Sequence, residues 1–231
     1  YDRGFAHGQL VVNEFKKMWE SNEFITFFDE GLQWDFFIQN SNRIFKSYIK
    51  KHFPEYLEEM QGIADGLTSA GFKKSLDDII AWNGMMVLVE YWWPSVKHKF
   101  LSHSHHREMH TGADRGATDR CSAFIAVGDV TKDGKIVLAH NTFDQFVNGQ
   151  NNHLILSIKP TSGHSLLMQS TPGYIWSGTD FFVTSSGFLG SETTIGGFMP
   201  YKVGAPIFCR IRKAMQYANK LDDYEKFLLK D

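Results

Sequence analysis

The chain has 231 residues, of which 42% are hydrophobic and 15% aromatic; this composition supports a buried core and excludes an intrinsically disordered polypeptide. Its formal net charge of -2 at pH 7 excludes the strongly basic surface that nucleic acids or anionic membranes attract. No apolar run approaches the roughly 18 residues of a membrane-spanning helix. The two cysteines, Cys121 and Cys209, are too few for a disulfide framework. We therefore expect no nucleic-acid partner and no transmembrane segment.

Residues 1 to about 93 have the apolar periodicity of helices. Pro54 suits the first turn of one helix, which ends near Gly71. Ser75 predicts the N-cap of another helix over 76–90, because acidic residues follow it in the first turn. An earlier helix is predicted to bury a face formed by Leu10, Val11, Phe15, Met18 and Trp19.

Residues 97–120 form a polar segment without periodicity, which predicts an exposed, flexible linker that is excised or disordered. Imidazoles at short spacing can bind Zn²⁺ or Ni²⁺. The segment has no partnering cysteine and no rigid scaffold, so we expect no metal site and no cofactor. Its clustered histidines are His103, His105, His106 and His110.

After residue 120 the pattern changes to short strands and then to helices. The Asp133-Gly134 pair predicts a hairpin turn. Strands are predicted at 122–127, 136–139, 153–158, 165–169, 181–184 and 188–195, and helices at 205–221 and 222–229. This order predicts an α+β fold. We divide it into a helical pro-segment at 1–96, the linker at 97–120, and the first part of a catalytic domain at 121–231, which we expect to continue beyond Asp231.

Cys121 stands between the polar linker and an apolar strand, so cleavage before it would make it a chain terminus. A terminal cysteine carries a thiol nucleophile and its own α-amine, whose ordinary pKa of about 8 suits a general base. One residue would then supply both groups, and cleavage would switch the enzyme on. The alternative interpretation is an inert buried thiol, which is common for free cysteines.

Four ordered runs of residues resemble the phospholipase B-like family. They contain Cys-Ser-Ala at 121–123, His-Asn-Thr at 140–142, Pro-Gly-Tyr at 172–174 with Asp-Phe-Phe at 180–182, and Glu-Thr-Thr-Ile-Gly at 192–196. In the helical part, runs at 3–8 and 60–66 resemble pro-segments of cysteine acyltransferases and amidases of the isopenicillin N acyltransferase type. Both groups are N-terminal-nucleophile hydrolases, so the resemblance implies a four-layer αββα fold behind a helical pro-segment.

The resemblance also implies roles for individual residues. Cys121 would cut the bond after Arg120 and then attack the substrate carbonyl. His140 would orient the thiolate, while Asn141 and Thr142 would hold the α-amine or a substrate oxygen. Thr193 falls where relatives place an oxyanion-hole asparagine. Asp144, Trp176 and Asp180 are further candidates for substrate binding.

Structural alternatives stay open for most of these residues. His140 could be a satisfied core histidine, and Thr193 could reflect strand propensity alone. Related acylases place an acidic residue at the position that is Phe143 here, and Asp144 follows it by one position. Asp144 could therefore be simply a solvated residue at a strand end. Trp176 could belong to the hydrophobic core.

The leading hypothesis is an autoproteolytically activated cysteine hydrolase that removes acyl chains from phospholipids or related lipid esters and amides. An acyltransferase or amidase acting on small N-acyl compounds would form the same acyl-enzyme. A lipid-binding protein that kept the fold but lost the chemistry is a third hypothesis. The expected partner is a lipid or N-acyl small molecule, and the cleaved fragments should stay associated. The resemblance implies an extracytoplasmic location, either lysosomal, secreted or periplasmic.

Overall fold

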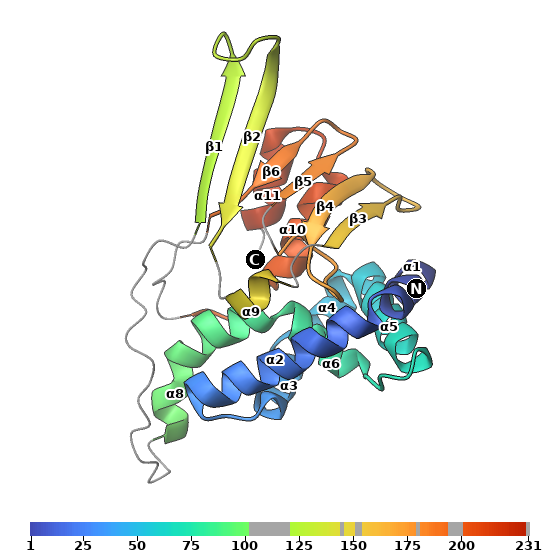
Figure 1. Ribbon diagram of the computed structural model, residues 1–231, viewed down its shortest axis with the longest axis vertical. Coiled ribbons are helices and arrows are strands. Elements are labelled where there is room, and N and C mark those ends of the chain that lie inside the picture. The colour runs from blue at the N-terminus through green and yellow to red at the C-terminus, as the bar shows by residue number, and fades with distance from the viewer. Residues whose placement is uncertain (102–120, 144–145, 151–153, 179–180, 194–200, 230–231) are drawn as a thin grey trace.

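The computed structural model describes residues 1–101, 121–143, 146–150, 154–178, 181–193 and 201–229 (Figure 1). The helices are α1 (Asp2–Leu10), α2 (Val12–Glu30), α3 (Trp34–Ser41), α4 (Ser47–His52), α5 (Pro54–Ser69), α6 (Leu76–Asn83), α7 (Met85–Val87), α8 (Trp93–Leu101), α9 (Phe146–Gly149), α10 (Ile207–Tyr217) and α11 (Leu221–Leu229), with π-helical turns η1 (Asn42–Lys46) and η2 (Leu88–Trp92). The strands are β1 (Cys121–Gly128), β2 (Gly134–Thr142), β3 (Leu154–Ile158), β4 (Leu166–Ser170), β5 (Phe181–Thr184) and β6 (Leu189–Ser191). The predicted α+β class is confirmed.

The N-terminal helices enclose the larger hydrophobic core, below the strands in Figure 1. Aromatic rings fill its centre: the ring centroid of Trp82 lies 5.1 Å from that of Phe15 and 5.7 Å from that of Trp19. The predicted buried face is therefore correct for most of its members. Leu10 is the exception, because it ends α1 and its side chain is 82% exposed.

Helices α1 and α5 cross in close backbone contact through glycines. A Cβ atom on Gly62 would lie 2.2 Å from the carbonyl oxygen of Tyr1, and one on Gly8 would lie 2.3 Å from that of Ile63. Gly4 and Gly66 are equally tight against the opposite helix. Small residues at four-residue spacing permit this approach, so the two helical motifs noted in the sequence are packing partners.

A Gly62→Ala substitution is therefore expected to lower the free energy of unfolding by about 2 kcal/mol or more, because the added methyl group forces the helices apart. Gly149→Ala is the matched control, since a Cβ atom there meets no atom within 4 Å. Urea denaturation of both variants checks the prediction. Equal stability of the two variants would contradict the crossing geometry.

The predicted helix over 76–90 begins as expected and then breaks. Ser75 Oγ accepts a hydrogen bond from the backbone N–H of Asp78, and the Asp78 carboxylate accepts one from the backbone N–H of Ser75. This is a reciprocal capping box. The expectation of one continuous helix was wrong, because α6 ends at Asn83. Tertiary contacts cause the break: Asn83 binds a distant loop, and Gly84 packs against the ring of Phe45.

Helix α8 extends through Leu101, beyond the point where the linker was predicted to begin. Phe100 accounts for this, because its ring packs edge-on against Phe36 at a centroid distance of 5.3 Å and lies 6.0 Å from the ring of Trp93. The remainder of the predicted linker, 102–120, lies outside the described residues.

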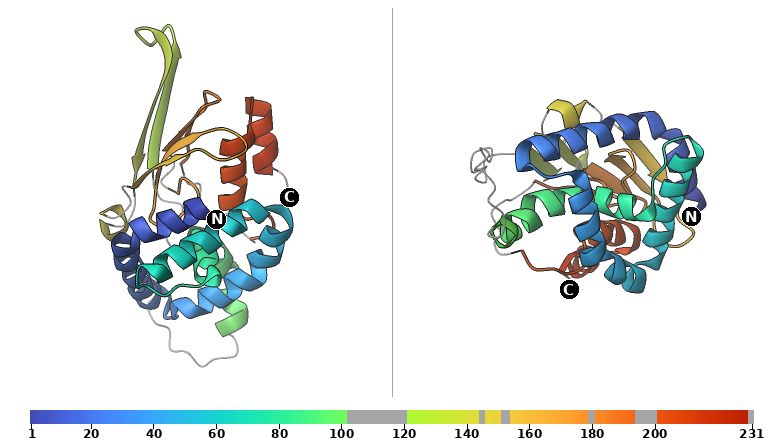
Figure 2. Two further views of the ribbon diagram at one scale, coloured as in Figure 1. Left: turned by 90° about the vertical axis from the view of Figure 1, so that its right-hand side faces the viewer. Right: turned by 90° about the horizontal axis from the view of Figure 1, so that it is seen from below.

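The strands form two small antiparallel sheets. Strands β1 and β2 pair as the predicted hairpin, and Gly134 adopts a φ of 72° at its turn. The other sheet has the order β3-β4-β5-β6, and the hairpin lies next to its edge strand β6. Helices α10 and α11 cover one face of this sheet (Figure 2), where Met168, Phe182 and Met215 are buried together.

The described residues do not show the four-layer αββα sandwich that the resemblance implies. A sandwich buries the facing surfaces of two sheets against each other. Here Ile155 and Leu167, on the face of the four-stranded sheet away from α10, are 62% and 48% exposed. The final predicted strand is also shorter than expected and ends at Ser191.

The loop at 171–177 fastens the four-stranded sheet to the helical core. The indole N–H of Trp82 donates to the carbonyl oxygen of Pro172 at 2.8 Å. The side-chain amide of Asn83 donates to the carbonyl oxygen of Gly173 at 3.1 Å. The loop itself is buried, so one of the four resembling motifs serves here as a structural anchor.

Candidate functional site

Cys121 is the first residue of β1, and its side chain is partly exposed. In the hairpin it pairs with Thr142, and Ala123 pairs with His140. Directly opposed residues in an antiparallel pair point to the same face of the sheet. The structure therefore places Cys121, His140 and Thr142 on one face of the hairpin.

Thr142 and His140 are also in direct contact. Thr142 Oγ1 lies 3.3 Å from His140 Nδ1. The other ring nitrogen, Nε2, is buried and has no hydrogen-bond partner among the described residues. A buried ring nitrogen left free in this way is available to a ligand or to the nucleophile itself.

Asn141 faces the opposite way. It pairs with Ser122, and its side-chain amide donates to Ser122 Oγ at 3.4 Å on the exposed face of the hairpin. The alternation of side chains along a strand separates it from the Cys121 face. The structure thus brings together the candidates at 121, 140 and 142 but not the one at 141.

The remaining candidates are dispersed or lie outside the described residues. Trp176 is buried in the helical core, where its ring stacks on Tyr174 at a centroid distance of 5.6 Å. Thr193 follows the end of β6 and is partly buried. Arg120, Asp144 and Asp180 lie outside the described residues.

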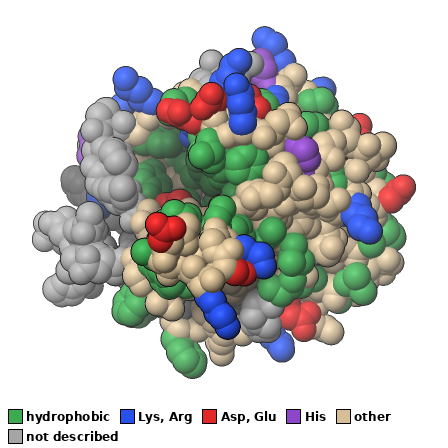
Figure 3. Space-filling model, turned by 90° about the horizontal axis from the view of Figure 1, so that it is seen from above, with side chains coloured by type: hydrophobic (Ala, Val, Ile, Leu, Met, Phe, Trp, Pro, Cys, Tyr) green, Lys and Arg blue, Asp and Glu red, His purple; other side chains and the backbone are tan. Residues whose placement is uncertain are grey.

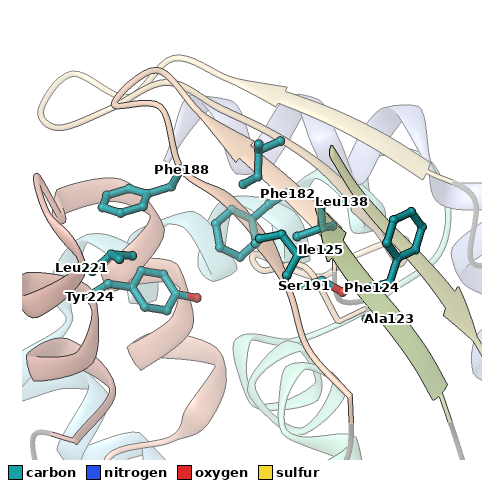
Figure 4. A pocket seen from close by; sticks show the side chains of 11 residues that line it. Ala123, Phe124, Ile125, Leu138, Phe182, Phe188, Ser191, Leu221 and Tyr224 are labelled. Atoms are coloured by element: carbon teal, nitrogen blue, oxygen red, sulfur yellow. The ribbon is translucent and has the colours of Figure 1, made fainter. Parts of the chain in front are cut away.

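An apolar pocket of about 350 Å³ lies between the hairpin, the four-stranded sheet and α11 (Figure 4). This volume falls at the small end of the usual range for ligand pockets. Figure 3 views the molecule from the hairpin end, where hydrophobic side chains gather around a hollow in the surface. The pocket-lining residues are Ala123, Phe124, Ile125, Leu138, Phe182, Phe188, Leu189, Gly190, Ser191, Leu221 and Tyr224.

Most of these residues had no identifiable signal in the sequence. Gly190 is needed because the ring of Phe182 lies across it, and a Cβ atom there would fall 1.9 Å from the ring. Tyr224 stacks on the same ring, and burial together with the charge of Glu192 raises the pKa of Tyr224 to about 12. Its hydroxyl is therefore neutral at physiological pH.

A buried ionic cluster, also unpredicted, joins the helical part to α10. Glu59 is only 2% exposed and accepts hydrogen bonds from Arg3 Nε at 3.0 Å and from Arg212 Nη2 at 3.1 Å. Arg212 is fully buried and also donates to the carbonyl oxygen of Ile175 at 2.5 Å. Burial by itself would raise the pKa of Glu59, but the two guanidinium groups lower it.

His7 links the N-terminal helix to the anchoring loop. Its Nε2 accepts a hydrogen bond from the backbone N–H of Gly173 at 3.2 Å, so the ring must be neutral there. Burial, with a smaller contribution from Arg212, lowers the pKa of His7 to about 4, although Glu59 opposes this shift. Protonation would therefore remove a contact between the helical part and the sheet.

Stability is expected to fall between pH 6.5 and 4 because of this histidine. The unfolded chain takes up the His7 proton near pH 6.5, whereas the folded chain does so only near pH 4. The unfolded state is thus favoured as pH drops, by on the order of 2 kcal/mol at pH 4.5. His7→Gln keeps an acceptor but does not titrate, so urea denaturation at pH 7 and 4.5 should give a smaller difference. An unchanged difference would contradict the assignment.

Comparison with known proteins gives one distant relative and no family. No family model matches the chain. It is 25% identical over 231 residues to an uncharacterized protein of Archaeoglobus fulgidus, in an alignment covering 96% of this chain and 36% of the relative. The chain thus spans little more than a third of that relative's length.

The described residues lack two features that concern membranes and metals. In that part of the chain, no helix is both long enough and apolar enough to cross a bilayer. In the same residues, no three histidine, cysteine or acidic side chains are placed to hold a metal ion. The histidine cluster at 103–110 lies outside them.

Proposed function

We propose that this protein is a cysteine hydrolase of the N-terminal-nucleophile type, activated when it cleaves its own chain between residues 120 and 121. One observation carries the proposal: Cys121 begins a strand and shares a face with His140 and Thr142. Its neighbour on that face, Ala123, lines the apolar pocket. The four motifs that resemble the phospholipase B-like family add independent support from the sequence.

The proposed chemistry starts from the cleaved chain, in which Cys121 has a free α-amine. The amine takes the thiol proton as the sulfur adds to the acyl carbonyl carbon. The tetrahedral intermediate then expels the alcohol or amine, which receives a proton, and a thioester remains on Cys121. Water adds to the thioester and releases the acid. In this proposal His140 orients the sulfur in the cleaved chain; its Nδ1 contacts Thr142, and its Nε2 has no hydrogen-bond partner among the described residues.

The proposed substrates are fatty acyl esters or amides, phospholipids included, because the pocket beside the nucleophile is lined mainly by hydrophobic side chains. An amidase or acyltransferase would use the same thioester, so turnover of lipid esters against small N-acyl amides separates the two. The four-layer αββα fold is part of this proposal, as is the extracytoplasmic location; both rest on the resemblance.

The fragments produced by cleavage are proposed to stay associated. The helical core includes residues from after the cleavage site, among them Tyr174, Ile175 and Phe208. The Glu59–Arg212 ion pair crosses the same boundary. A separated helical fragment would expose this core to water.

Intact mass measurement and N-terminal sequencing of the purified protein test the proposal. We expect a fragment that begins at Cys121 and co-purifies with an N-terminal fragment. A chain that stays whole through prolonged mildly acidic incubation would contradict self-cleavage and favour the non-catalytic lipid-binding alternative.

A further inference from the structure

We infer that Ser191 is the hydrogen-bonding residue of the pocket, and that it selects a ligand with an uncharged polar group, such as an amide or ester carbonyl, on a medium-length hydrocarbon. The inference rests on the proposed function only in treating this pocket as the acyl-binding part of the site. Beyond that function, it names Ser191 as a residue that determines specificity and predicts that neutral ligands bind better than anions.

Ser191 is placed to hydrogen-bond a ligand in the pocket. It ends β6, the sheet strand next to the hairpin, and it lines the pocket together with Ala123 and Ile125 (Figure 4). Its hydroxyl is shielded from solvent and has no hydrogen-bond partner among the described residues. A buried hydroxyl without a partner is costly, so a ligand group that pairs with it gains that energy on binding.

The surrounding side chains define the rest of the ligand. Ala123 lies on the Cys121 face of the hairpin, two residues from Cys121. Ser191 lies at the Ala123 end of the pocket, away from Phe188 and Leu221 (Figure 4). Phe188 and Leu221 provide hydrocarbon surface farther along (Figure 4). The ligand should therefore place its polar group at Ser191 and its chain toward α11.

Charge decides which polar group fits. None of the described residues that line the pocket is charged. The carboxylate of Glu192, next to Ser191 in the chain, contributes to the raised pKa of Tyr224. An unpaired carboxylate is expensive to bury, whereas an amide or ester is not when it is hydrogen-bonded. A neutral carbonyl compound should therefore bind better than the corresponding fatty acid anion.

Calorimetric titration of the Cys121→Ala protein with octanamide and octanoate at pH 7.5 tests this, because binding is then measured without turnover. We expect octanamide to bind at least about tenfold more tightly than octanoate, and Ser191→Ala to weaken octanamide about tenfold, the effect of losing one buried hydrogen bond. Ser191→Thr keeps the hydroxyl and should retain most of the affinity. Ser157→Ala, at an exposed position on β3, is the control and should change nothing.

The inference would be overturned if Ser191→Ala left the affinity for octanamide unchanged, or if the protein preferred octanoate. Absence of octanamide binding would overturn it too, and would leave cleavage at Cys121 unaffected as a separate result. Conversely, the expected selectivity in the binding test, together with a wild-type protein that never cleaves itself, would reject the proposed function and support the pocket assignment.

Discussion

A Cys121→Ala variant is expected to remain a single chain under conditions in which the wild-type protein is cut before residue 121. Self-cleavage requires a nucleophile at this position, and alanine has none. The effect should be complete, because the next hydroxyl of β1, that of Ser122, lies one residue beyond the scissile bond and points to the opposite face of the hairpin. Electrophoresis and intact mass after matched incubation of both proteins provide the measurement.

Cys209 supplies the matched control for this experiment. It is the other cysteine of the chain and is fully buried in α10, where burial raises the pKa of its thiol. Cys209→Ala should therefore cleave like the wild type, and iodoacetamide should label Cys121 in preference to Cys209. Cleavage that continues in Cys121→Ala, or that stops only in Cys209→Ala, would show that residue 121 is not the nucleophile.

A Glu59→Gln substitution is expected to lower the free energy of unfolding by about 3–5 kcal/mol, because it leaves the buried guanidinium of Arg212 without a counter-charge. Glutamine preserves the volume of the side chain, so the loss reports on charge. Arg3 contributes less, since its side chain is 35% exposed and is partly screened by solvent. Urea denaturation at pH 7 measures the difference.

The control is Glu20→Gln on α2. Glu20 lies 3.9 Å from Lys16 in an ion pair whose side chains are both more than half exposed, so its loss should change stability by less than about 0.5 kcal/mol. A comparably small effect of Glu59→Gln would show that Arg212 finds another partner or becomes solvated. Glu59 does not line the apolar pocket, so the Glu59→Gln substitution is expected to act on stability and not directly on the chemistry.

Features that depend on neighbouring residues could be predicted from the sequence. The capping box of Ser75 and Asp78 and the first-turn proline of α5 follow from hydrogen bonding and sterics within one helical turn. The hairpin of β1 and β2 agrees with the turn signal of the Asp133-Gly134 pair. The turn signal does not set the register that opposes Cys121 to Thr142, because the loop spans 129–133 and the pairing shifts between Ala126 and Gly128. The shared face of the proposed nucleophile and His140 depends on that register.

Features that join distant parts of the chain depend on tertiary contacts and could not be predicted in this way. Glu59 and Arg212 are 153 positions apart, and no local pattern marks two charges that neutralise each other in a core. Ser191 became a pocket residue because β6 ends beside the hairpin. The break after Asn83 arose because its amide binds a loop from the sheet. Local sterics and hydrogen bonding thus determine the elements, whereas pairing and packing between them set the face of the nucleophile, the pocket and its polar group.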